Sequence, residues 1–278
     1  MGTLYLVATP IGNLEDMSPR AVRMLREARL IAAEDTRHTR QLLTHFNLHA
    51  PLTSYFEHNK LTKLDAILSA LAEGDVALVS DAGTPGINDP GYELVKAALG
   101  AGYSVSPVPG PSAPVAALAA SGLPTDAFLY LGYLPRKSSE REAFLRKVEG
   151  LPYTLVFLET PHRLMESLDD LLNVLGDRPM VSARELTKLH EQFMRGRVSE
   201  IREHFARHEP RGEFVLIVDG QREEVSVRWP EEELLAEIEH ALQSGGKTRE
   251  ISAQLSARSG WSKKEIYSLM NRKSENKK

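Results

Sequence analysis

Residues 4–13 form the stretch Leu4-Tyr5-Leu6-Val7-Ala8-Thr9-Pro10-Ile11-Gly12-Asn13, where an apolar run ends in a turn that contains proline and glycine. Two later stretches repeat this order: Val76–Val79 leads into Ser80-Asp81-Ala82-Gly83-Thr84-Pro85-Gly86, and residues 105–108 lead into Pro109-Gly110-Pro111-Ser112-Ala113. In an open α/β sheet, ligands bind beyond the carboxyl ends of the strands, where glycine allows close backbone approach and proline fixes the turn. The three loops therefore predict a binding site at one edge of a sheet.

The first 122 residues alternate short β-rich runs with helix-length amphipathic segments, which is the pattern of parallel βα units. We expect helices to begin at Ser18-Pro19, at Asp89-Pro90 and, later, at Thr160-Pro161. Each pair offers an N-cap oxygen followed by proline at the first helical position. The predicted strands of this domain are residues 4–7, 30–32, 76–79 and 105–108.

A second α/β domain is predicted for residues 123–222, because the pattern pauses at Leu123-Pro124-Thr125-Asp126 and resumes with longer polar connections. Its last predicted strand, Phe214–Val218, comes late in the sequence, which favours a mixed sheet. Residues 1–122 would then carry a parallel sheet. The other predicted strands of the second domain are residues 128–131, 154–158, 180–183 and 191–195.

Residues 229–278 are predicted to form a helical extension, since strand-like runs stop after Gly220. Helices are expected at 231–243, 248–257 and 262–272, and Ser262-x-x-Glu265 is a capping box for the last one. From Ser244 onward nine basic residues stand against three acidic ones, a local charge of +6. Two interpretations stay open: a solvated helical cap, or an arm that contacts phosphate groups. The basic residues are Lys247, Arg249, Arg258, Lys263, Lys264, Arg272, Lys273, Lys277 and Lys278.

The composition excludes several kinds of site. The absence of cysteine removes disulfides, thiolate nucleophiles and cysteine-ligated zinc, and no His-Glu-x-x-His motif occurs, so no metal site is predicted. No run approaches the roughly 18 apolar residues of a membrane span, and we expect a cytoplasmic protein without a membrane partner. No G-x-G-x-x-G occurs, and Gly246-Lys247-Thr248 matches only the end of a P-loop. A ligand would therefore be held by backbone groups of several loops.

A set of motifs extends over most of residues 3–220. It comprises Thr9-Pro10-Ile11-Gly12-Asn13-Leu14, Ala33-Glu34-Asp35-Thr36-Arg37, Ser80-Asp81-Ala82-Gly83-Thr84-Pro85 with Asn88-Asp89-Pro90-Gly91, Pro109-Gly110-Pro111-Ser112-Ala113, Gly132-Tyr133-Leu134-Pro135-Arg136-Lys137, Glu159-Thr160-Pro161-His162-Arg163 and Ala183-Arg184-Glu185-Leu186-Thr187-Lys188. Together they resemble the tetrapyrrole-methylase superfamily and, more narrowly, its bacterial small-subunit rRNA cytidine 2′-O-methyltransferases. The resemblance continues into the helical extension, which that branch carries and the corrin-pathway members lack.

This resemblance implies a two-domain fold with S-adenosyl-L-methionine (AdoMet) bound in the cleft between the domains. It also implies methyl transfer to the ribose 2′-hydroxyl of a cytidine in 16S ribosomal RNA, by an enzyme that is typically a homodimer. The partner would be the RNA itself or the assembled small subunit. The implied cofactor-binding residues are Pro10, Gly12, Asp81, Gly83, Thr84, Ser112, Ala113, Phe157 and Ala183. We expect RNA contacts from Arg37, Arg40, Arg136, Lys137, His162, Arg163 and Lys188, and from Arg249, Arg258, Lys263 and Lys264 of the extension.

The ribose hydroxyl must lose a proton, and a positioned base typically accelerates such a step about 10²–10⁴-fold. The two candidate catalytic bases are Asp35, which follows the second predicted strand, and His58, in Glu57-His58-Asn59. Each has a competing structural interpretation. Asp35 would cap a helix that begins near Thr36, and His58 would be a surface residue.

Two other functions stay open at this point. A corrin-precursor C-methyltransferase would use the same loops on a small acidic substrate, but it would not need a basic helical extension. A non-catalytic RNA- or nucleotide-binding module would use the loops only as turns, and a titration with AdoMet distinguishes it from an enzyme.

Overall fold

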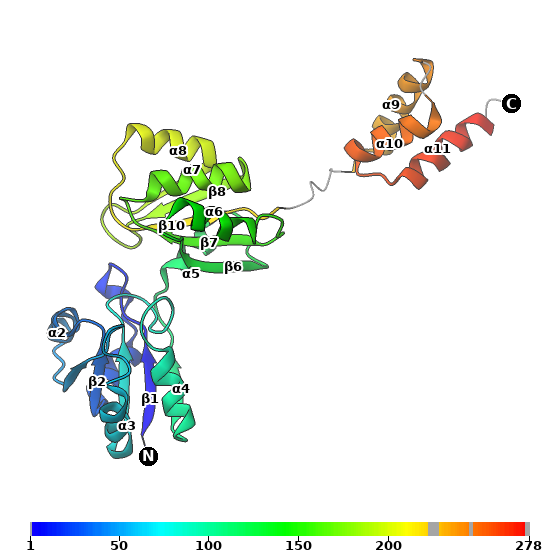
Figure 1. The fold of residues 1–278 in the computed structure, drawn as a ribbon. Coiled ribbons are helices and arrows are strands. Elements are labelled where there is room, and N and C mark those ends of the chain that lie inside the picture. The colour runs from blue at the N-terminus through cyan, green and yellow to red at the C-terminus, as the bar shows by residue number, and fades with distance from the viewer. Residues whose placement is uncertain (1, 222–227, 245–246, 276–278) are drawn as a thin grey trace. The chain divides into compact units, whose positions relative to one another are not determined.

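The computed structural model describes residues 2–221, 228–244 and 247–275. Contacts group them into two compact units, and the first unit ends at Gly220 and the second begins at Gln221. The first unit contains two five-stranded sheets, and the second contains helices α9 to α11. Figure 1 shows the order of the elements along the chain.

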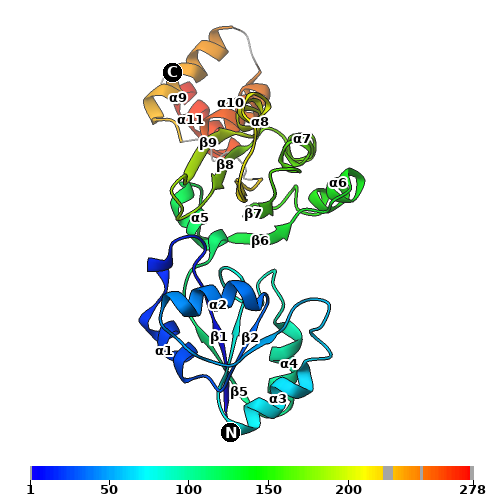
Figure 2. The same cartoon turned by 90° about the vertical axis from the view of Figure 1, so that its left-hand side faces the viewer.

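The first sheet is parallel throughout, in the order β3-β2-β4-β1-β5. Helices α1 and α2 cover one face, where Leu25 and Leu43 pack against Ile31 and Val79, and α3 and α4 cover the other. Figure 2 shows these helices around the strands. The strands are β1 (Thr3–Val7), β2 (Leu30–Ala33), β3 (Leu52–Ser54), β4 (Val76–Val79) and β5 (Ser104–Val108), and the helices are α1 (Pro19–Glu27), α2 (Thr36–His45), α3 (Leu64–Glu73) and α4 (Tyr92–Gly100), with a 3-10 turn η1 (Leu14–Asp16).

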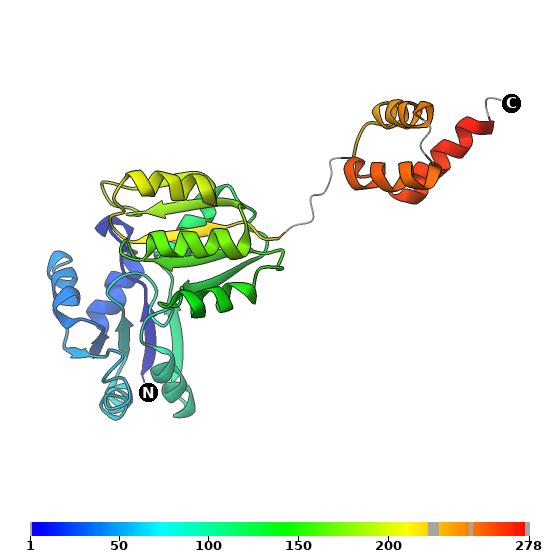
Figure 3. The ribbon, with the colours of Figure 1, turned by 45° about the horizontal axis from the view of Figure 1, so that its top comes forward.

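The second sheet is mixed, in the order β6-β7-β10-β8-β9, with only β6 and β7 parallel. Helices α6, α7 and α8 pack on one face, as Figure 3 shows for α7 and α8, and α5 packs on the other. The predicted parallel and mixed sheets are thus confirmed. The elements are α5 (Ala113–Ser121), β6 (Phe128–Tyr133), α6 (Ser138–Arg146), β7 (Thr154–Glu159), α7 (Leu164–Leu175), β8 (Pro179–Arg184), β9 (Gln192–Arg197), α8 (Val198–Arg207) and β10 (Phe214–Val218).

One of the three predicted helix starts is confirmed and two are wrong. The Ser18 hydroxyl accepts a hydrogen bond from the Ala21 amide and caps α1. By contrast, α4 begins only at Tyr92, where Gly91 takes the N-cap position without a side-chain bond, and the Asp89 side chain lines a cavity. Helix α7 likewise begins only at Leu164, after a turn closed by the Arg163 amide and the Thr160 carbonyl. Strand β3 was missed, since its Leu-Thr-Ser sequence is too short and too polar to stand out.

The second unit has a small core of its own, built from Leu234, Ile238, Ile251, Leu255 and Ile266. It comprises α9 (Glu231–Gln243), α10 (Thr248–Ser259) and α11 (Lys263–Glu275). The predicted capping box is present: the Glu265 carboxylate accepts from the Ser262 amide at 2.9 Å, and the Glu265 amide donates to the Ser262 hydroxyl at 3.3 Å. Among the nine basic residues that follow Ser244, Lys277 and Lys278 and the side chains of Arg272 and Lys273 lie outside the described residues.

Candidate functional site

The strand order brings the three proline-glycine loops together. They follow β1, β4 and β5, which are neighbours in the first sheet. The backbones of Thr9 and Gly83 exchange two hydrogen bonds, of 2.9 and 3.0 Å, and the Thr84 hydroxyl donates to the Pro111 carbonyl at 3.3 Å. Gly83 has a φ of 83°, a conformation that glycine adopts without strain. The predicted convergence of the loops is therefore confirmed.

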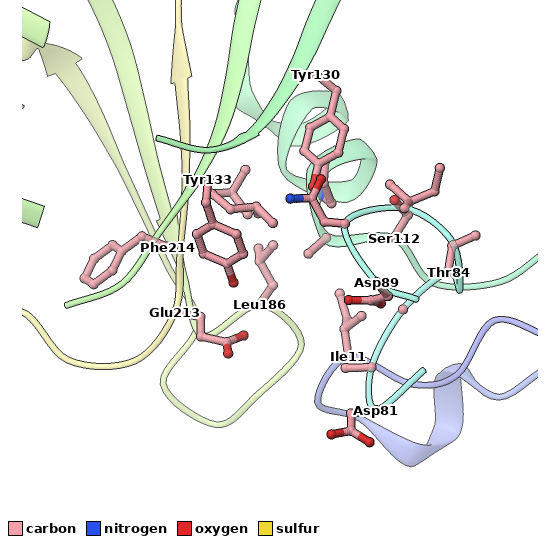
Figure 4. A pocket seen from close by; sticks show the side chains of 18 of the residues that line it. Ile11, Asp81, Thr84, Asp89, Ser112, Tyr130, Tyr133, Leu186, Glu213 and Phe214 are labelled. Atoms are coloured by element: carbon pink, nitrogen blue, oxygen red, sulfur yellow. The ribbon is translucent and has the colours of Figure 1, made fainter. Parts of the chain in front are cut away.

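A cavity of about 240 Å³ opens beside these loops, and we call it the acidic cavity. Its first wall comes from Asp81 to Thr84, Asp89 and Ser112 to Pro114, and its second wall comes from the mixed sheet and the loop after β8. In Figure 4, Tyr133, Leu186 and Glu213 of the second wall face Ile11 and Asp89 of the first. The site is thus made jointly by both sheets of the first unit.

The charge on this cavity is strongly negative. Five carboxylates line it, from Glu34, Asp81, Asp89, Glu185 and Glu213. The one lysine of the lining, Lys188, is paired with Glu185 at 2.9 Å. Desolvation raises the pKa of Asp89 to about 6, and repulsion by Glu34, Asp81 and Glu213 adds to the effect. Such a cavity favours a cationic ligand.

Two tyrosines of β6 supply neutral polar groups to the same cavity. Burial raises the pKa of Tyr130 to about 12 and also raises the pKa of Tyr133. Both phenols therefore stay protonated at neutral pH and can donate hydrogen bonds to a ligand.

Asp81, Gly83, Thr84, Ser112 and Ala113 line the acidic cavity, as expected of cofactor-binding residues. The other four predicted cofactor residues do not. Pro10 and Gly12 line a second cavity, while Phe157 and Ala183 are fully buried in the packing on the two faces of the mixed sheet. Side chains alternate between the faces of a strand, so Leu158 lines the acidic cavity and its neighbour Phe157 points away from it.

The second cavity, of about 290 Å³, lies between the loop after β1 and helix α2, and we call it the α2 cavity. Pro10 and Gly12 line it, whereas Ile11 between them lines the acidic cavity, so the loop after β1 contributes to both. Asp81 lines both. An adjoining surface recess is lined by Arg37, Arg40, Gln41, Thr44 and His45 of α2.

Neither predicted catalytic base lies in these cavities. Asp35 is the N-cap of α2, where its carboxylate accepts from the Arg37 amide at 2.8 Å and pairs with the Arg37 guanidinium at 2.6 Å. These contacts with Arg37 lower the pKa of Asp35 far below its usual range, which makes it a weak proton acceptor. His58 is exposed, and its ring lies 6.3 Å from the ring of Phe56. The structural interpretations of both residues are thus the better ones.

The predicted RNA-binding residues fall into three groups. Lys188 lines the acidic cavity, and Arg37 and Arg40 line the surface recess that adjoins the α2 cavity. Arg163 is turned inward: its guanidinium donates to the carbonyls of Leu134 and Pro135 and lies near Glu159. The remaining residues are exposed and lie outside the cavities, namely Arg136, Lys137 and His162 in the first unit and Arg249, Arg258, Lys263 and Lys264 in the second.

Several lining residues were missed from the sequence. Asp89 lies within Asn88-Asp89-Pro90-Gly91, which the sequence marks as a family motif and a helix start but not as a source of a site residue. His38 directly follows the Asp35-Thr36-Arg37 motif, and Glu34 precedes Asp35. Proximity to the loops in space, which the sequence does not report, is what identifies these three side chains.

Within the described ranges, no three His, Asp or Glu side chains are grouped as metal ligands would be. None of the helices described there combines the length and apolar character needed to cross a bilayer.

Residues 3–202 match the family described as Tetrapyrrole (Corrin/Porphyrin) Methylases. The chain is 48% identical to ribosomal RNA small subunit methyltransferase I of Halalkalibacterium halodurans, over 96% of this chain and 94% of that protein. It is 50% identical to the protein of the same name from Escherichia coli O157:H7, over 80% of this chain and 79% of that one. The chain belongs to the tetrapyrrole methylase family, in the branch of the small-subunit rRNA methyltransferases I.

Solved structures of family members share this fold. The methyltransferase CobJ superimposes with a TM-score of 0.61 at 19% identity, covering 83% of this chain and 97% of that one. Uroporphyrin-III C-methyltransferase from Thermus thermophilus, in complex with S-adenyl homocysteine, gives a TM-score of 0.54 at 24% identity, covering 78% of this chain and 97% of that one. The expected two-domain tetrapyrrole-methylase fold is therefore confirmed.

Proposed function

We propose that this chain is an AdoMet-dependent methyltransferase that modifies the ribose 2′-hydroxyl of a cytidine in 16S rRNA. The observation that carries the proposal is the acidic cavity, with its five lining carboxylates at the converging loops. AdoMet carries a sulfonium and an ammonium group, and both are cations that such a cavity attracts. The names of the curated relatives supply the class of substrate.

The residues at the cavity fit this cofactor. The backbone of Gly83, with no Cβ, lets a ligand approach closely, and the tyrosine hydroxyls of β6 are hydrogen-bond donors. Thr84, Ser112 and Ala113 complete the wall on the side of the first sheet. When bound, AdoMet supplies an electrophilic methyl group, and the protein has to hold the acceptor oxygen in line with it.

The same charge argues against a tetrapyrrole substrate. Corrin precursors carry several carboxylates, which the carboxylates of Asp89, Glu185, Glu213 and their neighbours would repel. An RNA phosphate would be repelled from this cavity as well. We therefore expect RNA to approach over basic residues outside it.

The helical unit offers such residues. Arg249, Lys263 and Lys264 are exposed on α10 and α11, and Arg258 lies 5.5 Å above the ring of Trp229. Replacing Lys263 and Lys264 with Gln should weaken RNA binding and reduce the slope of log K against log salt by roughly 1 to 2, because each phosphate contact contributes about 0.7 to 0.9.

Filter binding of a small-subunit rRNA fragment from about 50 to 200 mM salt measures this slope. Lys147→Gln, an exposed lysine at the end of α6, is the matched control and should leave the slope unchanged. An unchanged slope in the double variant would show that the extension is only a solvated cap.

Incubation with methyl-labelled AdoMet tests the function itself. Naked 16S rRNA, assembled small subunits and a tetrapyrrole precursor are offered separately, and the labelled product is digested and separated. We expect label in 2′-O-methylcytidine from one of the two RNA samples. Label in the tetrapyrrole would support the corrin-pathway alternative, and no binding of AdoMet would support a non-catalytic module. We further propose a cytoplasmic homodimer, for which sedimentation equilibrium should give twice the mass of the chain.

A further inference from the structure

A histidine of α2 and a carboxylate of the β4 loop form a pair at the boundary of the two cavities. Nδ1 of His38 lies 3.3 Å from Oδ2 of Asp81. The other carboxylate oxygen, Oδ1 of Asp81, accepts a hydrogen bond from the Asp35 amide at 3.0 Å, and the Asp81 amide donates to Glu34 at 3.3 Å. The carboxylate is thereby held in one orientation, with its free edge toward the imidazole.

This arrangement fixes which nitrogen of the imidazole is available. A carboxylate next to Nδ1 favours the tautomer with the proton on Nδ1, which leaves Nε2 as an acceptor. In the part of the chain that the structure describes, Nε2 of His38 has no hydrogen-bond partner. His38 lines the α2 cavity. A histidine that lines a cavity and has an unpaired acceptor nitrogen is a suitable proton acceptor.

The charges of the two cavities separate their ligands. The acidic cavity, with its five lining carboxylates, attracts the cationic groups of AdoMet. Its carboxylates also repel the phosphates that flank a nucleotide in RNA. The α2 cavity, at about 290 Å³, instead shares Gln41 and His45 with the recess lined by Arg37 and Arg40. Arg40 has no ion pair among the described residues.

We propose that the target nucleotide enters the α2 cavity and that His38, oriented by Asp81, accepts the proton of its 2′-hydroxyl. This inference rests on the proposed function. As the hydroxyl oxygen forms a bond to the methyl carbon, the carbon–sulfur bond of AdoMet breaks and its electron pair stays on sulfur. The hydroxyl proton passes to Nε2 of His38. The products are the 2′-O-methyl ribose, neutral S-adenosylhomocysteine and an imidazolium paired with Asp81, which then returns its proton to water.

The charged groups that face His38 are consistent with this role. Asp81 faces His38 from the loop after β4. Arg37 and His45 lie on α2 with His38, and Asp35 caps that helix. The loop after β1 contributes Thr9, Pro10, Gly12 and Leu14 to the cavity, none of them ionisable. The imidazolium formed in the step would therefore be stabilised mainly by Asp81.

Single-turnover methyl transfer by His38→Ala tests the proposal. With saturating AdoMet and RNA, the rate should fall about 10²–10⁴-fold, and added imidazole should restore part of it. The Kd values for AdoMet and for RNA should stay within about twofold, because His38 is exposed and does not line the acidic cavity. His49→Ala, another exposed histidine, is the matched control and should keep the wild-type rate.

A second measurement does not depend on turnover. Diethyl pyrocarbonate modifies accessible neutral imidazoles, and an rRNA fragment that fills the α2 cavity should protect His38 but not His49, as read by peptide mass spectrometry. Two results would overturn the role of His38 but not the proposed function. One is a His38→Ala variant as active as an active wild type. The other is a variant that loses only RNA affinity and is not rescued by imidazole. A wild type that methylates no RNA would overturn the proposed function and this inference with it.

Discussion

Replacing Asp89 with Asn should stabilise the folded protein at neutral pH and weaken its binding of AdoMet. Asp89 is half-buried in the acidic cavity, where desolvation and three neighbouring carboxylates raise its pKa from 3.8 to about 6. A hydrogen bond from Ser80 offsets part of that increase. Asn has nearly the same shape as Asp and carries no charge, so the change removes the repulsion without creating a cavity.

The size and the pH dependence of the effect follow from this pKa. A pKa raised from 3.8 to about 6 corresponds to at most about 3 kcal/mol that the ionised carboxylate costs the folded state at neutral pH, and solvent screening of this partly exposed group lowers the expected cost to about 1–2 kcal/mol. Below about pH 4 the group is protonated in both states, so the cost vanishes. As the pH rises, the Asp89 carboxyl ionises in the unfolded chain at a lower pH than in the folded protein. The variant should therefore gain stability over the wild type between about pH 4 and 6 and keep that gain at higher pH.

Urea unfolding at about pH 4, 5.5 and 7.5 measures this difference. Asp65→Asn, an exposed acid in the first turn of α3, is the matched control and should change the free energy of unfolding by less than about 1 kcal/mol at every pH. Calorimetry at about pH 7.5 should show the Kd for AdoMet rising about fivefold in Asp89→Asn, since one charge interaction in a partly exposed site is worth on the order of 1 kcal/mol. A stability gain that is equal at all three pH values, or an Asn variant less stable than the wild type near neutrality, would refute the reasoning.

Two further substitutions test the packing behind the site. Gly12→Ala should destabilise the protein by about 1–3 kcal/mol and weaken AdoMet binding, because the new Cβ would lie 2.9 Å from a backbone oxygen in the loop after β8. Gly100→Ala is the control and should be neutral or stabilising, because the space around Gly100 is open. Equal urea midpoints for the two variants would contradict this prediction. Arg141→Ala should cost about 3–5 kcal/mol, since it leaves the buried carboxylate of Asp170 without its partner at 2.7 Å. The exposed pair of Arg146 is worth less than about 1 kcal/mol, so Arg146→Ala is the control, and similar losses in both arginine variants would contradict the assignment.

The sequence by itself determined most of the elements and the edge of the sheet at which the site lies. Apolar β-rich runs that end in Pro10-Ile11-Gly12, Asp81-Ala82-Gly83 and Pro111-Ser112-Ala113 do become strands with loops at one edge of a sheet, because these local preferences are set by residues close together in the chain. The motifs that resembled the family were sufficient for the family assignment. The Ser18 cap and the Ser262 capping box also follow from local sequence.

Only the tertiary structure decided which side chains face the cavities. An apolar run such as 154–158 predicts a strand but does not say which of its faces meets a ligand, so Phe157 was chosen where Leu158 lines the cavity. His38 and Asp81 stand 43 positions apart in the sequence, and their contact depends on the order in which β2 and β4 pair. The pKa of Asp89 depends on burial and on carboxylates brought close by the fold. Contacts of this kind are long-range, and no local pattern encodes them.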